Sequence, residues 1–206
     1  PKGLVGSEMC IRDSASSMHD KYSIIGGVFN PDYSENLKFA KEIGLDESRV
    51  YEDYDKMIQE ELKLDKSQRM QVVSILTPNF LHYPMAKKLL ENNFNVICEK
   101  PMTTTYKEAL DLERIYKSKK LTFAVTYTYT GYPMIRQMKE MIKNGIIGDI
   151  QRVDLQYYQG WINPIIHDAV KRSETWRLQP DKSGISCCIG DILSLIHISE
   201  PTRPLG

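Results

Sequence analysis

Apolar runs alternate with amphipathic stretches along the first two thirds of this chain. Four of the runs are short, are rich in β-branched and aromatic residues, and are bounded by turn-forming residues, which predicts β-strands. We expect these strands at residues 22–30, 70–79, 94–101 and 121–129. The second run is nearly all apolar until Pro78 and Asn79 close it, a pattern typical of a strand buried on both faces.

The stretches between these runs carry apolar residues at the three- to four-residue spacing of an α-helix. In the first of them, Leu37, Ala40 and Ile43 recur at this spacing before Gly44 ends the pattern. Helices are predicted at residues 34–45, 53–64, 80–93, 103–120 and 132–148. Beyond them, residues 149–161 alternate between polar and apolar side chains, which predicts a half-exposed strand.

Regular alternation of strands and helices over residues 22–130 predicts an α/β fold with parallel strands and right-handed crossovers. Ligands of such open sheets bind at the carboxyl ends of the strands. The residues that directly follow the predicted strands are therefore the candidates for a site. They are Asn30, then Thr77, Pro78 and Asn79, then Glu99 and Lys100, and finally Thr126 to Tyr129.

Charge and composition exclude several classes of partner. Lysine plus arginine and aspartate plus glutamate each number 27 among 206 residues, so no net positive charge attracts nucleic acid. No stretch reaches the roughly 18 apolar residues of a membrane span, and the N-terminus lacks the pattern of a signal peptide. We therefore expect a cytoplasmic protein with neither nucleic acid nor a membrane as partner.

Cysteine and histidine positions show no metal-binding pattern. None of the four cysteines stands in a CxxC pair, and adjacent cysteines rarely form a disulfide with each other. The cysteines are Cys10, Cys98, Cys187 and Cys188, and the histidines are His19, His82, His167 and His197. The sequence predicts reduced thiols and no metal site.

Lys100 is a candidate for acid–base chemistry. A lysine held at a strand end and partly removed from water has a lowered pKa, and it can move a proton or polarise an oxygen. Pro101 fixes the chain path after it and is a candidate for a cis peptide bond. The alternative interpretation of Glu99 and Lys100 is an exposed ion pair at the end of a strand.

Two further strand ends carry groups suited to a nucleotide. Asn79 and His82 stand at the start of a predicted helix, whose free N–H groups suit phosphate or ribose, although a simple helix cap fits as well. In a dinucleotide-binding fold, the residue at the position of Asn30 binds the ribose 2′-hydroxyl. An asparagine there leaves both NAD and NADP open, and a turn residue is the alternative.

Taken together, the stretch TPNFLH at 77–82 and Glu99-Lys100-Pro101 some twenty residues later resemble the glucose–fructose oxidoreductase/inositol dehydrogenase (Gfo/Idh/MocA) family. The resemblance extends over about residues 20 to 193. It includes VYEDYDKMI at 50–58, the stretch from Phe123 to Ile150, and WRLQPDKSGISCCIGDI at 176–192.

This resemblance implies an enzyme that transfers a hydride between the nicotinamide of NAD or NADP and a hydroxyl carbon of a sugar or cyclitol. It implies a Rossmann-like domain over residues 15–131. Residues 132–193 would begin a C-terminal α/β substrate domain with a large antiparallel sheet. It also implies a sugar or polyol as substrate and a homo-oligomer.

Site residues follow from the same resemblance. Asp191 and Lys100 match catalytic positions, and Lys100 matches the lysine that orients the reacting hydroxyl. Cofactor contacts are implied for Asn30, Thr77, Pro78, Asn79, His82, Glu99, Lys100, Trp176 and Arg177. The family histidine four residues after the acid is replaced here by Leu195, and His197 lies two residues further, roughly 200° around a helix.

Both ends of the chain depart from the family pattern. Residues 1–14 and 194–206 resemble translated adapter sequence, so we expect non-native flanks there. The sequence contains no GxGxxG, the loop that cradles the pyrophosphate. We therefore expect an internal fragment that lacks activity and binds a dinucleotide weakly.

Two other interpretations share the strand–helix alternation. A non-catalytic dinucleotide-binding or regulatory protein would keep the fold but would need neither Lys100 nor Asp191. A flavodoxin-like or response-regulator domain would need an acidic cluster or a flavin loop, and neither is visible in the sequence.

Overall fold

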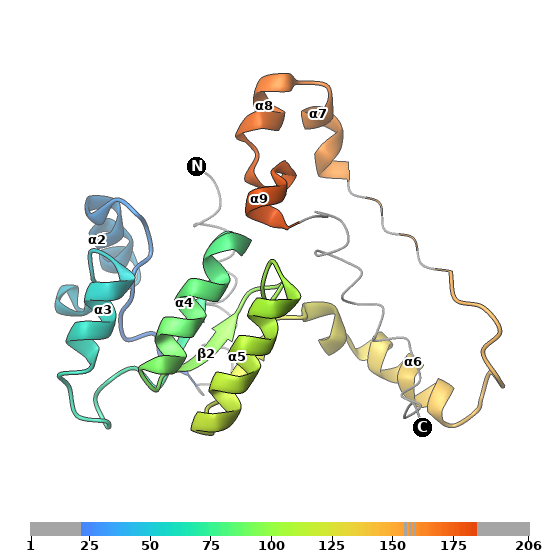
Figure 1. The fold of residues 1–206 in the computed structure, drawn as a ribbon, viewed down its shortest axis with the longest axis horizontal. Helices are drawn as coiled ribbons and strands as arrows, with labels where there is room; N and C mark the ends of the chain where they lie inside the picture. The colour runs from blue at the N-terminus through green and yellow to red at the C-terminus, as the bar shows by residue number, and fades with distance from the viewer. Residues whose placement is uncertain (1–21, 155, 157, 159, 185–206) are drawn as a thin grey trace. The chain divides into compact units, whose positions relative to one another are not determined.

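The computed structural model describes residues 22–154, 156, 158 and 160–184. The chain divides into two compact units. Unit 1 comprises residues 1–77, 84–98 and 110–124, and unit 2 comprises residues 78–83, 99–109 and 125–206. The predicted strand–helix alternation is visible in the ribbon from α2 to β3, and the three strands form a parallel sheet in the order β1-β2-β3 (Figure 1).

The sheet consists of β1 (Val72–Ile75), β2 (Asn95–Cys98) and β3 (Phe123–Val125). β1 and β2 pair with Val72 opposite Asn95 and with Ile75 opposite Cys98. The Asn95 amide also links the strand beginnings, because Nδ2 donates to Gln71 O at 2.8 Å and Oδ1 accepts from Thr122 N at 2.9 Å.

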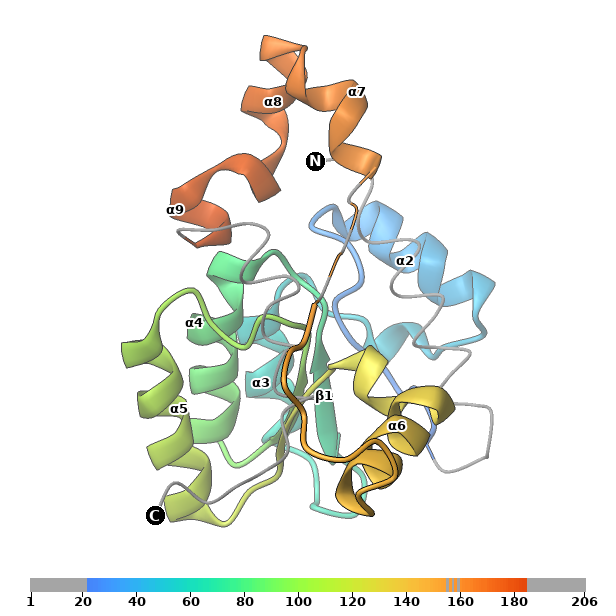
Figure 2. The same cartoon turned by 90° about the vertical axis from the view of Figure 1, so that its right-hand side faces the viewer.

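Helices α4 (Asn79–Glu91) and α5 (Tyr106–Lys119) follow β1 and β2, as the sequence predicted. They lie side by side in both views (Figures 1 and 2), and a 2.8 Å ion pair between Lys87 and Asp111 joins them. α5 begins with a capping box, in which Glu108 N donates to Thr105 Oγ1 and Thr105 N donates to Glu108 Oε2. The apolar core of unit 1 includes Ile75, Leu89, Leu90, Phe94, Val96 and Leu112, all at most 1% exposed.

Three shorter helices precede the sheet, and an aspartate caps the N-terminus of each. Asp32 caps α2 (Tyr33–Glu42), Asp46 caps the 3-10 helix η1 (Glu47–Arg49), and Asp53 caps α3 (Tyr54–Glu61). A small core of Phe29, Ala40 and Val50 packs beside α2. The positions of α2 and α3 confirm the predicted helices at 34–45 and 53–64.

The predicted strand at 22–30 was too long. Gly27 forms a single parallel bridge with Val50, through Gly27 N to Arg49 O at 3.0 Å and Tyr51 N to Gly27 O at 3.1 Å. Gly26 lets the two backbones approach, because a Cβ at this position would lie 2.3 Å from Arg49 O. Only part of the apolar run is buried: Phe29 packs in the small core, whereas Tyr22 and Ile25 are exposed.

A buried acid connects three segments of unit 1. Glu61, at the end of α3, is fully buried, and its carboxylate lies 2.6 Å from the Arg49 guanidinium. The carboxylate also accepts hydrogen bonds from Tyr51 Oη at 2.6 Å and from Met70 N at 2.7 Å. Burial and this hydrogen bond raise the pKa of Tyr51 to about 12. Glu61 thereby holds α3, the segment after η1 and the residues before β1 together.

Unit 2 contains one longer helix and several short ones (Figure 1). The longer helix is α6 (Pro133–Lys143), which confirms the start of the predicted helix at 132–148. The short helices are η2 (Thr128–Gly131), η3 (Gly160–Ile162), α7 (Asn163–Ile166), α8 (Ala169–Glu174), η4 (Trp176–Leu178) and α9 (Pro180–Ser183).

Two strand predictions need correction. The described residues of 149–161 form no strand, and the described part of the chain contains no antiparallel sheet. Alternating polarity gives a strand two faces, but its backbone groups still need a partner strand. Here polar side chains bond locally instead, as Arg152 Nε does to Asp154 Oδ1 at 3.1 Å. β1 is also not buried on both faces, because Ser74 is exposed.

In the described part of the chain, no helix is long and apolar enough to cross a membrane. Of the cysteines, only Cys98 lies among the described residues; it is a reduced cysteine, buried at the end of β2. Burial raises the pKa of the Cys98 thiol to about 12, so it packs as an apolar side chain and is not a nucleophile at neutral pH.

Replacing Glu61 tests the buried cluster. We expect Glu61→Gln to lower the free energy of unfolding by about 3 kcal/mol, because Arg49 then keeps a poorly solvated charge without its counterion. The matched control is Glu60→Gln, which removes a half-buried acid from the same helix and is expected to change stability by at most about 0.5 kcal/mol. Urea unfolding followed by circular dichroism measures both. Equal effects of the two substitutions would contradict the account.

Candidate functional site

The segments that follow β1 and β2 meet in unit 2. His82, on the first turns of α4, is fully buried, and its Nδ1 lies 2.7 Å from the backbone oxygen of Pro101. The peptide bond between Lys100 and Pro101 is cis, as its sequence context suggested. The contact links the TPN segment to the Glu-Lys-Pro segment, although 19 positions separate His82 from Pro101.

Asn79 makes a second connection within unit 2. Its Nδ2 donates to Ser183 O at 3.1 Å, so the start of α4 is joined to the end of α9. Ser183 is buried, and its hydroxyl donates to Gln179 O at 3.0 Å. Thr77, just before this segment and in unit 1, donates from Oγ1 to Met85 Sδ at 3.7 Å. Thr77 and Asn79 both follow β1, but the Thr77 side chain bonds within the nearby chain, whereas the Asn79 side chain bonds to a distant segment.

Glu99 and Lys100 come directly after the buried end of β2, and both are partly buried. Lys100 N donates to Glu99 Oε2 at 3.2 Å, so the acid folds back over its own backbone. The alternative of an exposed ion pair predicts exposed side chains, whereas both residues are partly buried. Because its main chain is fixed, a lysine at this place can hold its side-chain nitrogen in one position. Such a fixed polar group is what the orientation of a substrate requires.

Trp176 and Arg177 lie together on η4, with the guanidinium carbon 4.7 Å from the centroid of the indole ring. Trp176 Nε1 is buried and has no hydrogen-bond partner among the described residues, and the same holds for Thr126 Oγ1 after β3. Buried donors normally find partners in a native protein. A polar group of a bound ligand could therefore serve as the hydrogen-bond partner of each of these two atoms.

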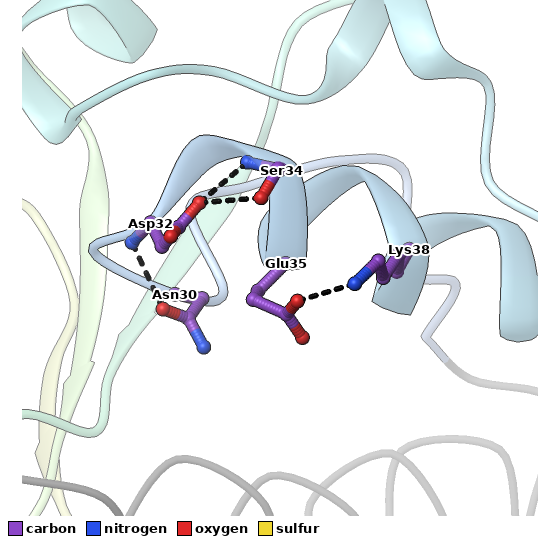
Figure 3. Close-up of polar contacts among 5 residues, drawn as sticks. All are labelled: Asn30, Asp32, Ser34, Glu35 and Lys38. Atoms are coloured by element: carbon purple, nitrogen blue, oxygen red, sulfur yellow. Dashed lines mark hydrogen bonds and ion pairs between the residues drawn. The ribbon is translucent and has the colours of Figure 1, made fainter.

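Asn30 belongs to unit 1 and holds a tight turn before α2 (Figure 3). Its Oδ1 accepts a hydrogen bond from Asp32 N at 2.9 Å. In the same turn, Asp32 Oδ1 accepts from Ser34 N at 2.8 Å and from Ser34 Oγ at 2.7 Å. The Asn30 amide nitrogen points away from these contacts, so it can donate to a ligand hydroxyl.

Several expected residues fall outside the described part of the chain. These are Asp191, Leu195 and His197, the cysteines other than Cys98, and the flanks 1–14 and 194–206. Sequence reasoning also missed Ser183, which the structure brings to Asn79. No local signal could have found it, because 104 positions separate the two residues.

The described residues fit a dinucleotide better than a metal ion. Within the described part, no three His, Cys, Asp or Glu side chains are grouped closely enough to hold a metal. The predicted cofactor-contacting residues instead offer amides, hydroxyls, an indole N–H and a lysine. The orphaned Trp176 Nε1 and Thr126 Oγ1 and the outward amide of Asn30 are the kinds of donor that ribose, phosphate and carboxamide oxygens need.

His82 can be tested as the link between the two segments. We expect His82→Leu to lower the free energy of unfolding by about 1–3 kcal/mol, since it leaves the Pro101 carbonyl without this partner. His82→Asn should cost less, because its amide nitrogen lies near the place of Nδ1. His167→Leu, at an exposed position after α7, serves as the control and should have little effect. Thermal unfolding compares the three, and a harmless His82→Leu would refute the link.

Comparison with known proteins identifies the family to which this chain is similar. Residues 3–127 match the Gfo/Idh/MocA model, which is described as an oxidoreductase family with an NAD-binding Rossmann fold. The uncharacterized oxidoreductase YfiI of Bacillus subtilis is 36% identical over 171 residues, which are 83% of this chain and 43% of YfiI. Levoglucosan dehydrogenase of Pseudarthrobacter phenanthrenivorans is 33% identical over 135 residues, 65% of this chain and 32% of the relative.

Solved structures agree with this match. An inositol dehydrogenase homolog from Azotobacter vinelandii, complexed with NAD+, superposes with a TM-score of 0.84 at 28% identity. The alignment covers 95% of this chain and 51% of that structure, so the chain spans about half of its structural relative and less of its curated ones. The matched region is the NAD-binding domain, and the chain belongs to the Gfo/Idh/MocA family of oxidoreductases.

Proposed function

We propose that these residues belong to an NAD(P)-dependent dehydrogenase that acts on a hydroxyl carbon of a sugar or polyol. The observation that carries the proposal is the contact between His82 and Pro101. It joins the TPN and Glu-Lys-Pro segments in a chain of this family. The names of two relatives, one a levoglucosan dehydrogenase and one an inositol dehydrogenase homolog, support a sugar or cyclitol as substrate.

The proposed cofactor contacts are those that the family resemblance implies. They are Asn30, Thr77, Pro78, Asn79, His82, Glu99, Lys100, Trp176 and Arg177. When bound, the nicotinamide accepts or supplies the hydride. In this proposal Asn30 donates to a ribose hydroxyl and Trp176 Nε1 donates to a polar group of the bound ligands. His82 acts chiefly by holding Pro101, and hence Lys100, in position.

Lys100 is proposed to orient the reacting hydroxyl and to stabilise negative charge on its oxygen. Its backbone is fixed on one side by the buried end of β2 and on the other by the contact of Pro101 with His82. A cation held this way requires little reorganisation during reaction, which favours catalysis. Asp191 is the proposed second catalytic residue.

The proposed domain division is a Rossmann-like domain at 15–131 and the start of a substrate domain at 132–193, with non-native flanks. Tyr129 and Tyr132 stand on either side of the proposed domain boundary, with ring centroids 5.3 Å apart. Aromatic and hydroxyl groups of this kind suit stacking on a sugar ring. A homo-oligomer is also proposed, as the family resemblance implies.

A non-catalytic dinucleotide-binding protein is the second candidate. Leu195 at the position of the family histidine, together with the lack of a GxGxxG sequence, favours it. A screen of sugars and polyols with NAD+ and NADP+, run on a full-length enzyme that contains residues 15–193 and followed by nicotinamide absorbance, separates the two. Binding without turnover would support the second candidate and would overturn the proposed dehydrogenase.

Lys100→Met tests the proposed chemistry in an enzyme that contains residues 15–193. We expect kcat to fall by about 10² or more, because the substrate oxygen loses its cation, while dinucleotide binding changes much less. Lys100→Arg should restore part of the rate because it keeps the charge. Lys107→Met removes an exposed lysine from α5 and is the control. Unchanged turnover in Lys100→Met would exclude this role for Lys100.

A further inference from the structure

Thr126, the residue directly after β3, carries a buried hydroxyl group without a hydrogen-bond partner. Its Oγ1 atom is shielded from solvent, and no partner for it lies among the described residues. The residue as a whole is only half-buried. Valine has nearly the shape of threonine, and it would fill the same place without an unsatisfied polar group. Local packing and bonding therefore do not account for the hydroxyl group.

The strand order places Thr126 next to the Glu-Lys-Pro segment. β3 neighbours β2 in the sheet, and Val96 N donates to Thr122 O at 3.0 Å. In a parallel pair, an N–H bonds to the carbonyl one position before the partner residue, so Val96 lies opposite Phe123. Three positions further along each strand stand Glu99 and Thr126. Thr126 and the Glu-Lys-Pro segment therefore leave the same edge of the sheet from neighbouring strands.

A tight turn fixes the backbone around Thr126. Tyr127 N donates to Val125 O at 2.9 Å, and this bond makes a γ-turn with Thr126 at its centre. Tyr127 O in turn accepts from Thr130 N at 3.0 Å and from Thr130 Oγ1 at 2.6 Å, at the start of η2. The chain path is thus held on both sides of Thr126, while its hydroxyl stays outside this network. Such an arrangement suits a contact with a ligand.

A second unsatisfied donor lies in the same unit. Trp176 Nε1, on η4, is also buried without a partner among the described residues. The segment that carries it returns to the strand ends, because Asn79 Nδ2 donates to Ser183 O at 3.1 Å and a Cβ on Gly184 would lie 3.5 Å from Thr104 O. In the described part of unit 2, both buried side-chain donors without a partner therefore belong to segments at the candidate site.

We propose that Thr126 is a further cofactor-contacting residue, whose hydroxyl forms a hydrogen bond with the carboxamide of the bound nicotinamide. The inference rests on the proposed function, because it assumes that the dinucleotide lies at the carboxyl ends of the strands. A hydroxyl group both donates and accepts hydrogen bonds, and so does a carboxamide. The two groups are therefore complementary in either orientation of the carboxamide.

The neighbourhood of Lys100 favours the nicotinamide end of the cofactor. Lys100 is proposed to hold the reacting hydroxyl, and hydride transfer requires the nicotinamide ring to lie directly beside that hydroxyl carbon. Thr126 leaves the strand next to the one that Lys100 follows. In this proposal, rotation about χ1 turns the Thr126 hydroxyl towards the carboxamide, because the hydroxyl and methyl groups of threonine exchange between staggered positions. The cofactor then supplies the partner that Oγ1 lacks among the described residues.

Thr126→Val tests the inference in a full-length enzyme that contains residues 15–193. Isothermal titration calorimetry gives the Kd values for NAD+ and for ADP-ribose, which is the same cofactor without its nicotinamide. We expect the Kd for NAD+ to rise about three- to tenfold, the effect of one neutral hydrogen bond, and the Kd for ADP-ribose to stay unchanged. Thermal unfolding without cofactor is the second measurement. The Tm should stay at or above the wild-type value, because the hydroxyl has no partner in the described chain to lose.

Two further variants serve as controls. Thr126→Ser keeps the hydroxyl group, so its Kd for NAD+ should stay within about twofold of the wild-type value. Thr122→Val removes a threonine hydroxyl from an exposed residue just before β3, at the opposite end of the strand. This substitution should leave both Kd values unaltered.

Three other results overturn the inference in distinguishable ways. A lowered Tm in Thr126→Val would show that the hydroxyl bonds within the protein. An unchanged Kd for NAD+, or an equal rise for NAD+ and ADP-ribose, would show that the hydroxyl does not contact the nicotinamide, and the proposed function would stand. If the wild type does not bind NAD+ at millimolar concentration, the proposed cofactor site itself is wrong, and the inference falls with it.

Discussion

The candidate site depends on the partly buried hydrogen bond between the His82 ring and the Pro101 carbonyl. A carbonyl that is removed from water needs a hydrogen-bond partner, and His82 supplies one from the first turns of α4. The pairing of β1 with β2 brings the carboxyl ends of both strands to one edge of the sheet. The contact then fixes the two segments that leave this edge, and with them Asn79 and Lys100.

Buried and exposed acids have different tasks in this chain. Glu61 is fully buried, and its charge is balanced by Arg49 and by two hydrogen-bond donors, so it connects segments of unit 1. The capping aspartates, of which Asp32 is the example at Asn30, keep their charge at the surface. An exposed charge contributes little to stability, but it acts on any charged ligand placed within a few ångströms. The same carboxylate chemistry therefore connects buried segments in one place and caps helices at the surface in another.

Local patterns predicted the helices and three of the strands, because apolar spacing and caps such as Thr105 with Glu108 are properties of short segments. They overestimated the strands at 22–30 and 149–161, since a ladder depends on partners that no local pattern reports. Strand ends likewise indicated Asn30, Asn79 and Lys100 as candidates. The same reasoning could not foresee contacts between distant positions, such as Asn79 with Ser183, or the orientation of a side chain such as Asp32.

An NAD+ titration of the isotopically labelled chain, followed residue by residue by NMR, tests the central claim most directly. The account predicts chemical-shift changes concentrated in residues 77–82 and 99–104 and in the turn at Asn30, with little change in α3 around Glu61. Shifts that leave the first two segments unaffected, while other parts of the chain respond, would contradict the claim that these strand ends form the cofactor site.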